Sequence, residues 1–151
     1  MFEEGNLLKF SPFNFKNGAT PKDKYFIVLK NVNDGLLLAT LPTSKDHVPS
    51  DITNSHGCIE LPDRQVNVYV FEANEIIANV INDNSPFSFA LNTFVYGADV
   101  ETYPIVTFKQ QIKLKLTSIQ LLAKLTPEKL ADLQYCLKNS KMVKNKYRKM
   151  L

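Results

Sequence analysis

The stretch KYFIVLKNVNDGLLLATL, residues 24–41, contains two apolar segments separated by a short turn. Residues 24–32 are rich in aromatic and β-branched side chains, which favour strands. The turn Asn-Asp-Gly at residues 33–35 tolerates positive φ and is typical of hairpins. Residues 36–41 form the second apolar segment. Because both segments are apolar at nearly every position, we expect a β-hairpin that is buried on both faces.

Other segments with strand-like patterns surround this hairpin. They are residues 67–73, the segment TFVYG at 93–97, and residues 104–116. In the last of these, three aliphatic positions alternate with Gln111, Lys113 and Lys115. This alternation predicts a half-exposed strand with a basic outer face.

The C-terminal part changes to a helical period. Thr126 is suited to be an N-cap, Pro127 to be the first helical residue, and apolar residues then recur at helical spacing. Several short strands followed by one helix predict a mainly β fold, a small and strongly bent barrel against which the helix packs. We expect a single domain over residues 1–151, with a basic helical tail at 138–151.

Composition limits the class of protein. The chain is 44% hydrophobic and 22% charged, which is typical of a globular protein. It contains no apolar run of the roughly 20 residues that span a bilayer. A signal peptide begins with basic residues, whereas this sequence has the acidic Glu3 and Glu4 near its start. We therefore expect a cytoplasmic protein that does not bind membranes. In that compartment we favour reduced, buried thiols at Cys58 and Cys136 over a disulfide bond.

The net charge of +3 is mild, but its distribution is uneven. No acidic residue follows Asp132, whereas six basic residues do: Lys138, Lys141, Lys144, Lys146, Arg148 and Lys149. A solvated helix end is the simpler interpretation, because lysines also suit the negative pole of a helix. A tail that attracts phosphate is the alternative.

Reactive side chains gather directly after the hairpin. His47, His56 and Cys58 are of the types that bind zinc, and Cys136 could join them, but their spacing matches no familiar ligand pattern. Ser44 or Cys58 beside a histidine could form a nucleophile–base pair, but no glycine-flanked turn surrounds Ser44. We therefore expect no bound metal or cofactor, and we interpret Cys58 as a core residue.

Cleavage of RNA through its own 2′-hydroxyl has simpler requirements. It needs a base, an acid, and donors or cations that stabilise the charge on phosphorus. The segment PTSK at residues 42–45 provides two hydroxyls and an ammonium at the end of the hairpin. Lys22 and Lys24 provide two further ammoniums at its start.

These segments resemble the PemK/MazF-type toxins of toxin–antitoxin systems. The similar parts are residues 22–44, with KYFIVL and LPTSK, and residues 111–137, with QIKLKL and AKLTPEKLADL. Residues 46–107 are longer than the corresponding part of the family. The resemblance implies an SH3-like barrel, a homodimer, and a metal-independent endoribonuclease that cleaves single-stranded RNA. It also implies an antitoxin protein that occupies the RNA groove at the dimer interface.

The resemblance also implies roles for individual residues. Thr43 and Ser44 match the Thr-Ser pair that contacts the scissile phosphate, and Lys24 and Lys113 fall where the family has catalytic arginines. The remaining candidates for substrate binding are Lys22, Lys45, His47, His56 and Lys115. The lysine ammonium is a point charge, and it cannot bind phosphate through two parallel hydrogen bonds as the planar guanidinium of arginine does. The alternative is therefore a barrel that binds protein or nucleic acid without cleaving it.

Overall fold

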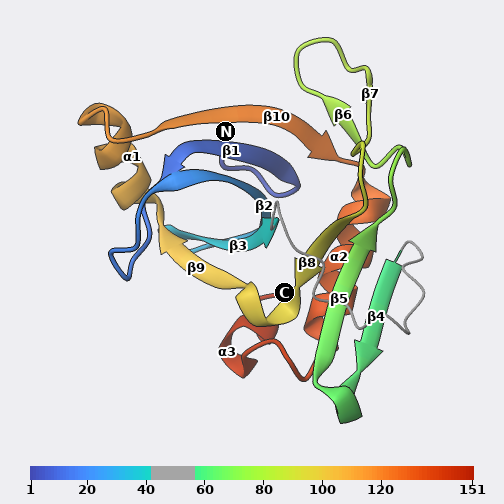
Figure 1. Cartoon of the computed structure of the whole chain (residues 1–151). Coiled ribbons are helices and arrows are strands. Elements are labelled where there is room, and N and C mark those ends of the chain that lie inside the picture. The colour runs from blue at the N-terminus through green and yellow to red at the C-terminus, as the bar shows by residue number, and fades with distance from the viewer. Residues whose placement is uncertain (42–56) are drawn as a thin grey trace.

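The computed structural model describes residues 1–41 and 57–151, and two antiparallel sheets dominate it (Figure 1). The larger sheet has the strand order β7-β6-β10-β1-β2-β3-β9 and the smaller one the order β4-β5-β8. The strands of the larger sheet are β1 (Asn6–Phe13), β2 (Lys22–Val32), β3 (Gly35–Leu41), β6 (Ala78–Val80), β7 (Pro86–Phe87), β9 (Glu101–Pro104) and β10 (Ser118–Leu125). Those of the smaller sheet are β4 (Gly57–Leu61), β5 (Val66–Phe71) and β8 (Thr93–Tyr96). The fold is therefore mainly β, as predicted.

Helical segments connect and cover the sheets. They are η1 (Pro62–Arg64), η2 (Gly97–Asp99), α1 (Ile105–Lys113), α2 (Pro127–Lys138) and α3 (Asn145–Arg148). None of the helices in the described residues is long and apolar enough to cross a membrane.

The predicted hairpin is confirmed as β2 and β3, which pair in antiparallel register from Tyr25 opposite Leu41 to Val32 opposite Gly35. Its alternate residues enter two different cores. Ile27 and Leu29 belong to a core that α2 covers, whereas Phe26 and Val28 belong to an aromatic core on the other face. All four side chains are almost fully buried. The hairpin is apolar throughout because it separates two cores.

Residues 104–116 do not form the predicted strand. β9 ends at Pro104, α1 occupies Ile105–Lys113, and the next strand, β10, begins only at Ser118. Phe108 explains the difference, since it lies 4.9 Å from Phe10 between ring centroids and is only 2% exposed. Helical spacing brings Ile105 and Phe108 onto the aromatic core together. The basic strand face expected for Lys113 and Lys115 therefore does not exist.

The C-terminal helix is confirmed as α2. The side chain of Thr126 accepts a hydrogen bond from the backbone N–H of Lys129 at 3.3 Å, which is the predicted N-cap. After α2, Val143 and Tyr147 are buried against the first core. The basic tail is thus packed against the body of the protein through its apolar side chains.

Strand pairing does not close the larger sheet among the described residues. β7 and β9 remain its two edges, although Figure 1 shows that the sheet is curved, with β10 and β9 on opposite sides of the hairpin. The coarse prediction of a bent, mainly β fold with a C-terminal helix is therefore met.

The expectation of two reduced thiols is wrong. Cys58 on β4 and Cys136 on α2 form a disulfide bond, with their Cα atoms 5.6 Å apart. Cys58 is exposed and is not a core residue, whereas Cys136 is 3% exposed. The bond forms because α2 packs against the smaller sheet, a contact between segments 78 residues apart in the sequence.

Candidate functional site

A pocket of about 330 Å³ lies where the hairpin ends, and we call it the Lys24 pocket. Its floor is formed by Lys24 and Phe26 on β2 and by Thr40 on β3. Phe26 pairs directly with Thr40, and Lys24 lies two residues away, so the three side chains share one face of the sheet. Its walls come from distant segments: Phe13, Phe15, Ala98, Asp99, Val100, Glu101, Tyr103 and Lys144.

The pKa of Lys24, in the floor of this pocket, is lowered by its surroundings. Partial burial lowers the pKa of its ammonium group below the ordinary value of 10.5, and the neighbouring charge of Lys22 lowers it further. The carboxylate of Asp99 acts in the opposite direction. A lysine with a lowered pKa releases its proton more readily, which suits a general acid.

Glu101 is held in place by several hydrogen bonds. Lys16 Nζ donates to its Oε1 at 2.9 Å and also donates to the carbonyl oxygen of Thr102 at 2.7 Å. The hydrogen bond from Lys16 lowers the pKa of the Glu101 carboxyl below its ordinary value of 4.5, and burial opposes this effect. Glu101 is therefore an ionised, fixed wall of the pocket at neutral pH.

Tyr103 forms the aromatic wall. Its hydroxyl donates to Glu101 Oε2 at 3.3 Å, and Lys16 Nζ lies 4.2 Å from the centre of its ring. Burial, followed by the charge of Glu101, raises the pKa of the Tyr103 hydroxyl well above its ordinary range. The phenol therefore remains protonated at all physiological pH values.

The structure brings only some of the predicted site residues together. Lys24 lines the pocket, and Lys22 is close enough to lower the pKa of Lys24. Lys113 ends α1 and does not line the pocket, while Lys115 lines a separate groove beside Met1 and Leu116. The other predicted residues lie outside the described residues: Thr43, Ser44, Lys45, His47 and His56.

Sequence reasoning missed three polar residues of the pocket, Asp99, Glu101 and Tyr103, and named Lys144 only as one lysine of the basic tail. Asp99 and Glu101 reach it because β9 pairs with β3, and Lys144 because the tail folds back onto the sheet. Nothing in the local pattern indicates these contacts. Only the basic character of the tail suggested that one of its lysines approaches a phosphate site.

The disulfide bond bears on the two other chemistries considered for the chain only through its two cysteines, because Ser44, His47 and His56 lie outside the described residues. Cys58 and Cys136 are joined to each other, so in this state neither is a thiolate ligand or a nucleophile. Within residues 1–41 and 57–151, no three His, Cys, Asp or Glu side chains are grouped so that they could hold a metal ion.

Comparison of the chain with protein-family models, with curated proteins and with solved structures gave no match. The site must therefore be interpreted from its own geometry and from the resemblance of its sequence segments.

Gly97 directly precedes Ala98 and Asp99 of the pocket wall, and its replacement is expected to destabilise the fold. A Cβ atom there would lie 2.9 Å from Val143 Cγ2 and still closer to Asn67 Oδ1. Because both neighbours are buried, Gly97→Ala should lower the free energy of unfolding by about 1–3 kcal/mol. Urea denaturation measures this change, with Ala98→Ser at the exposed next position as the control. An unchanged midpoint for Gly97→Ala would contradict this packing.

Proposed function

We propose that the protein is a toxin-like endoribonuclease of the PemK/MazF type, which cleaves single-stranded RNA without a metal or cofactor. One observation carries the proposal: Lys24, at the position where the resemblance implies a catalytic cation, lies in a pocket at the hairpin end, where its pKa is lowered. The resemblance further suggests an SH3-like barrel, a homodimer, and an antitoxin protein that blocks the RNA site.

The pocket supplies groups for each proton transfer. Asp99 is exposed and makes no hydrogen bond within the described residues, so its carboxylate is available to accept the proton of the 2′-hydroxyl. The 2′-oxygen then attacks phosphorus and the bond to the 5′-oxygen breaks, while Lys24 donates its proton to that oxygen. The products are a 2′,3′-cyclic phosphate and a 5′-hydroxyl. Lys22 and Lys144 are the cations that would stabilise the charge on phosphorus.

We further propose that the enzyme acts in the cytoplasm, and this location has a consequence for the disulfide bond. The cytoplasm keeps most protein thiols reduced. The proposed enzyme must therefore remain folded and active after the bond between Cys58 and Cys136 is opened.

A second candidate function is RNA or protein binding without turnover. The position of Lys113 favours it, because the second catalytic cation implied by the resemblance belongs to α1 and does not line the Lys24 pocket. The two functions differ in whether bound RNA is cut.

Analysis of RNA ends tests the proposal. Incubation with single-stranded RNA is expected to yield fragments with a 2′,3′-cyclic phosphate and a 5′-hydroxyl. A single 2′-deoxy nucleotide at the cleaved position should abolish cutting there, because it removes the nucleophile. Fragments with 3′-hydroxyl ends, or equal cutting of the 2′-deoxy substrate, would contradict the mechanism.

Lys144 tests whether the basic tail contacts phosphate. Deletion of the tail is unsuitable, since Val143 and Tyr147 are 1% and 3% exposed and belong to the core. Lys144→Gln is expected to weaken RNA binding and to reduce the slope of log K against log salt by about 0.7. Filter binding at several salt concentrations measures this slope, with the exposed Lys109→Gln on α1 as the control. An unchanged slope would identify the tail lysines as a solvated surface.

A further inference from the structure

An unpaired sheet edge runs along the first half of β10, which leads from the end of α1 toward β6 (Figure 1). On one side β1 pairs with residues 118–124 of β10, whereas on the other side β6 pairs only with residues 123–125. Among the described residues, no strand lies beside residues 118–122 on that second side. In an antiparallel pair, every second residue directs its backbone N–H and C=O away from the partner. Residues 118–122, which we call the β10 edge, can therefore pair with a further strand.

The other edges of this sheet are protected, but the β10 edge is not. On β9, Lys16 Nζ donates to the carbonyl oxygen of Thr102 at 2.7 Å, and Pro104 has no N–H. β7 consists of only two residues and begins with Pro86. Residues 118–122 contain neither a proline nor a charged side chain, which are the usual features that keep a strand edge from pairing with another chain.

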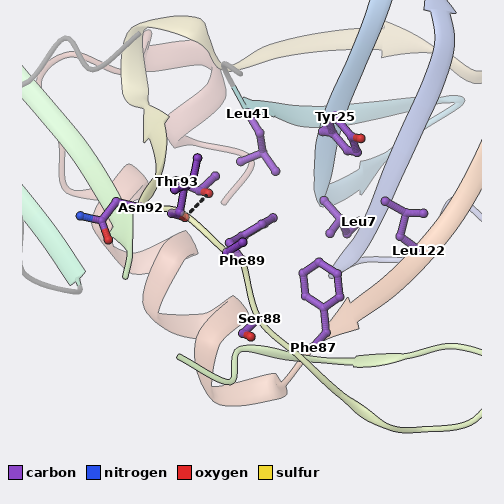
Figure 2. Close-up of a pocket in the computed structure, with 11 residues that line it drawn as sticks. Leu7, Tyr25, Leu41, Phe87, Ser88, Phe89, Asn92, Thr93 and Leu122 are labelled. Atoms are coloured by element: carbon purple, nitrogen blue, oxygen red, sulfur yellow. Dashed lines mark hydrogen bonds between the residues drawn. The ribbon is translucent and has the colours of Figure 1, made fainter. Parts of the chain in front are cut away.

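Packing on both faces holds the β10 edge in place. Ile119 and Leu121 pack against the aromatic core, and Leu122 packs against the core that α2 covers. Together with Leu7, Leu122 also lines the apolar cavity of about 410 Å³ that Figure 2 shows. An added strand would therefore meet a preformed surface, and little ordering of this side would be needed.

A groove of about 510 Å³ borders the start of the β10 edge, and we call it the Met1 groove. Its apolar walls are Met1, Pro12, Ile112, Leu116 and Ile119. Met1, Ile112 and Leu116 are 51%, 40% and 53% exposed although their side chains are large and apolar. Exposed apolar side chains that gather in one place are typical of contact sites for other proteins. Because the side chains of a strand alternate between the two faces, an added strand would direct some of them toward Ile119 and the groove.

The chain around the Met1 groove is basic. Residues 102–127 contain four lysines and no aspartate or glutamate. Lys124 pairs with Glu3 at 3.1 Å. The other three form no ion pair within residues 1–41 and 57–151: Lys109, Lys113 and Lys115. Lys115 lines the groove itself, so the groove favours a ligand that carries carboxylates.

These features together select one kind of ligand. An anionic membrane would suit the lysines, but hydrocarbon cannot satisfy the backbone groups of the β10 edge. The described residues that line the groove include no aromatic ring on which the bases of a nucleic acid could stack. A second copy of this chain would bring its own lysines toward the same site.

We propose that the β10 edge and the Met1 groove bind an extended, acidic segment of a partner protein by strand addition. The backbone of this segment pairs with residues 118–122, and one of its apolar side chains enters the groove against Ile112 and Leu116. Its carboxylates lie near Lys113 and Lys115. This inference does not rest on the proposed function, because the Met1 groove and the Lys24 pocket share no lining residue.

Titration of the full chain with synthetic peptides tests this inference. The probes are decapeptides that alternate glutamate with valine, isoleucine or leucine. At least one of them is expected to shift the NMR signals of residues 112–122 and to slow amide hydrogen exchange in the β10 edge. The same peptide should not bind when every backbone nitrogen is methylated, or when lysine replaces glutamate.

A charge-reversed variant tests the role of the lysines. Lys113→Glu combined with Lys115→Glu should weaken peptide binding roughly 5- to 30-fold at low salt, because attraction becomes repulsion. Lys138→Glu is the matched control, since Lys138 is also exposed and lies in the last turn of a helix but does not line the groove. This control should bind the peptide as the unaltered protein does, and both variants should keep its circular dichroism.

Several results would overturn the inference. Binding of none of the peptides, or equal binding of the methylated peptide, would exclude strand addition. Equal binding by the charge-reversed variant and its control would exclude the lysines. Signal shifts in the Met1 groove caused by phosphatidylserine vesicles and by no peptide would identify a membrane contact site instead. Dimers that protect the β10 edge in the absence of peptide would identify it as an interface between two copies.

Discussion

Replacement of Lys24 by methionine is expected to lower the rate of RNA cleavage roughly 10²- to 10⁴-fold, the usual contribution of a general acid. Methionine keeps the length of the aliphatic chain but cannot donate a proton or carry charge. Because burial lowers the pKa of Lys24, its proton is released more readily than that of an exposed lysine. The loss should appear mainly in kcat, since the proton is transferred in the transition state.

Lys30→Met is the matched control for this variant. Lys30 lies on the same strand, β2, but toward its other end and opposite Leu37. Its ammonium is 3.8 Å from Glu4 on the surface, and it does not line the Lys24 pocket. Both variants should show the circular dichroism of the unaltered protein. Equal cleavage rates for the two would contradict the role of Lys24, as would a loss confined to KM.

Removal of the disulfide bond is expected to have the largest effect on stability. The bond joins residues 78 positions apart, and the entropy of closing such a loop corresponds to about 4.5 kcal/mol. The double variant Cys58→Ala, Cys136→Ala should therefore unfold at a clearly lower urea concentration. Part of the loss also comes from Cys136, a residue of α2 that is buried where this helix packs against the smaller sheet.

A thiol reductant separates the bond from the packing of the cysteines. Reduction should lower the stability of the unaltered protein toward that of the double variant and leave the variant unchanged. Equal stability of the oxidised and reduced protein would contradict a contribution from the bond. The reduced protein must also retain cleavage if the enzyme acts in the cytoplasm.

The hairpin could be predicted because the residues that specify it are adjacent in the sequence. The apolar segments on either side of Asn33, Asp34 and Gly35 specify two strands and their turn, and burial on both faces follows from continuous apolar character. The N-cap at Thr126 was predictable for the same reason, since the cap and the bonded N–H of Lys129 are three residues apart.

Features that depend on distant segments were not predictable in this way. The alternation of Ile112, Lys113 and Leu114 indicated a strand, but packing of Phe108 against Phe10 across the aromatic core favours a helix. The disulfide bond likewise requires that α2 packs against the smaller sheet. For the pocket, sequence reasoning named Lys24 but not the walls that β9 and the tail provide, and the predicted Thr43 and Ser44 lie outside the described residues.

Cleavage in the presence of EDTA tests the central claim most directly. The purified protein and its Lys24→Met variant would be incubated at micromolar concentration with single-stranded RNA, and the fragments separated on a denaturing gel. The account predicts that the unaltered protein cuts with undiminished rate in EDTA and that the variant is nearly inactive. No cutting by the unaltered protein, or equal cutting by both preparations, would contradict a metal-independent ribonuclease centred on Lys24.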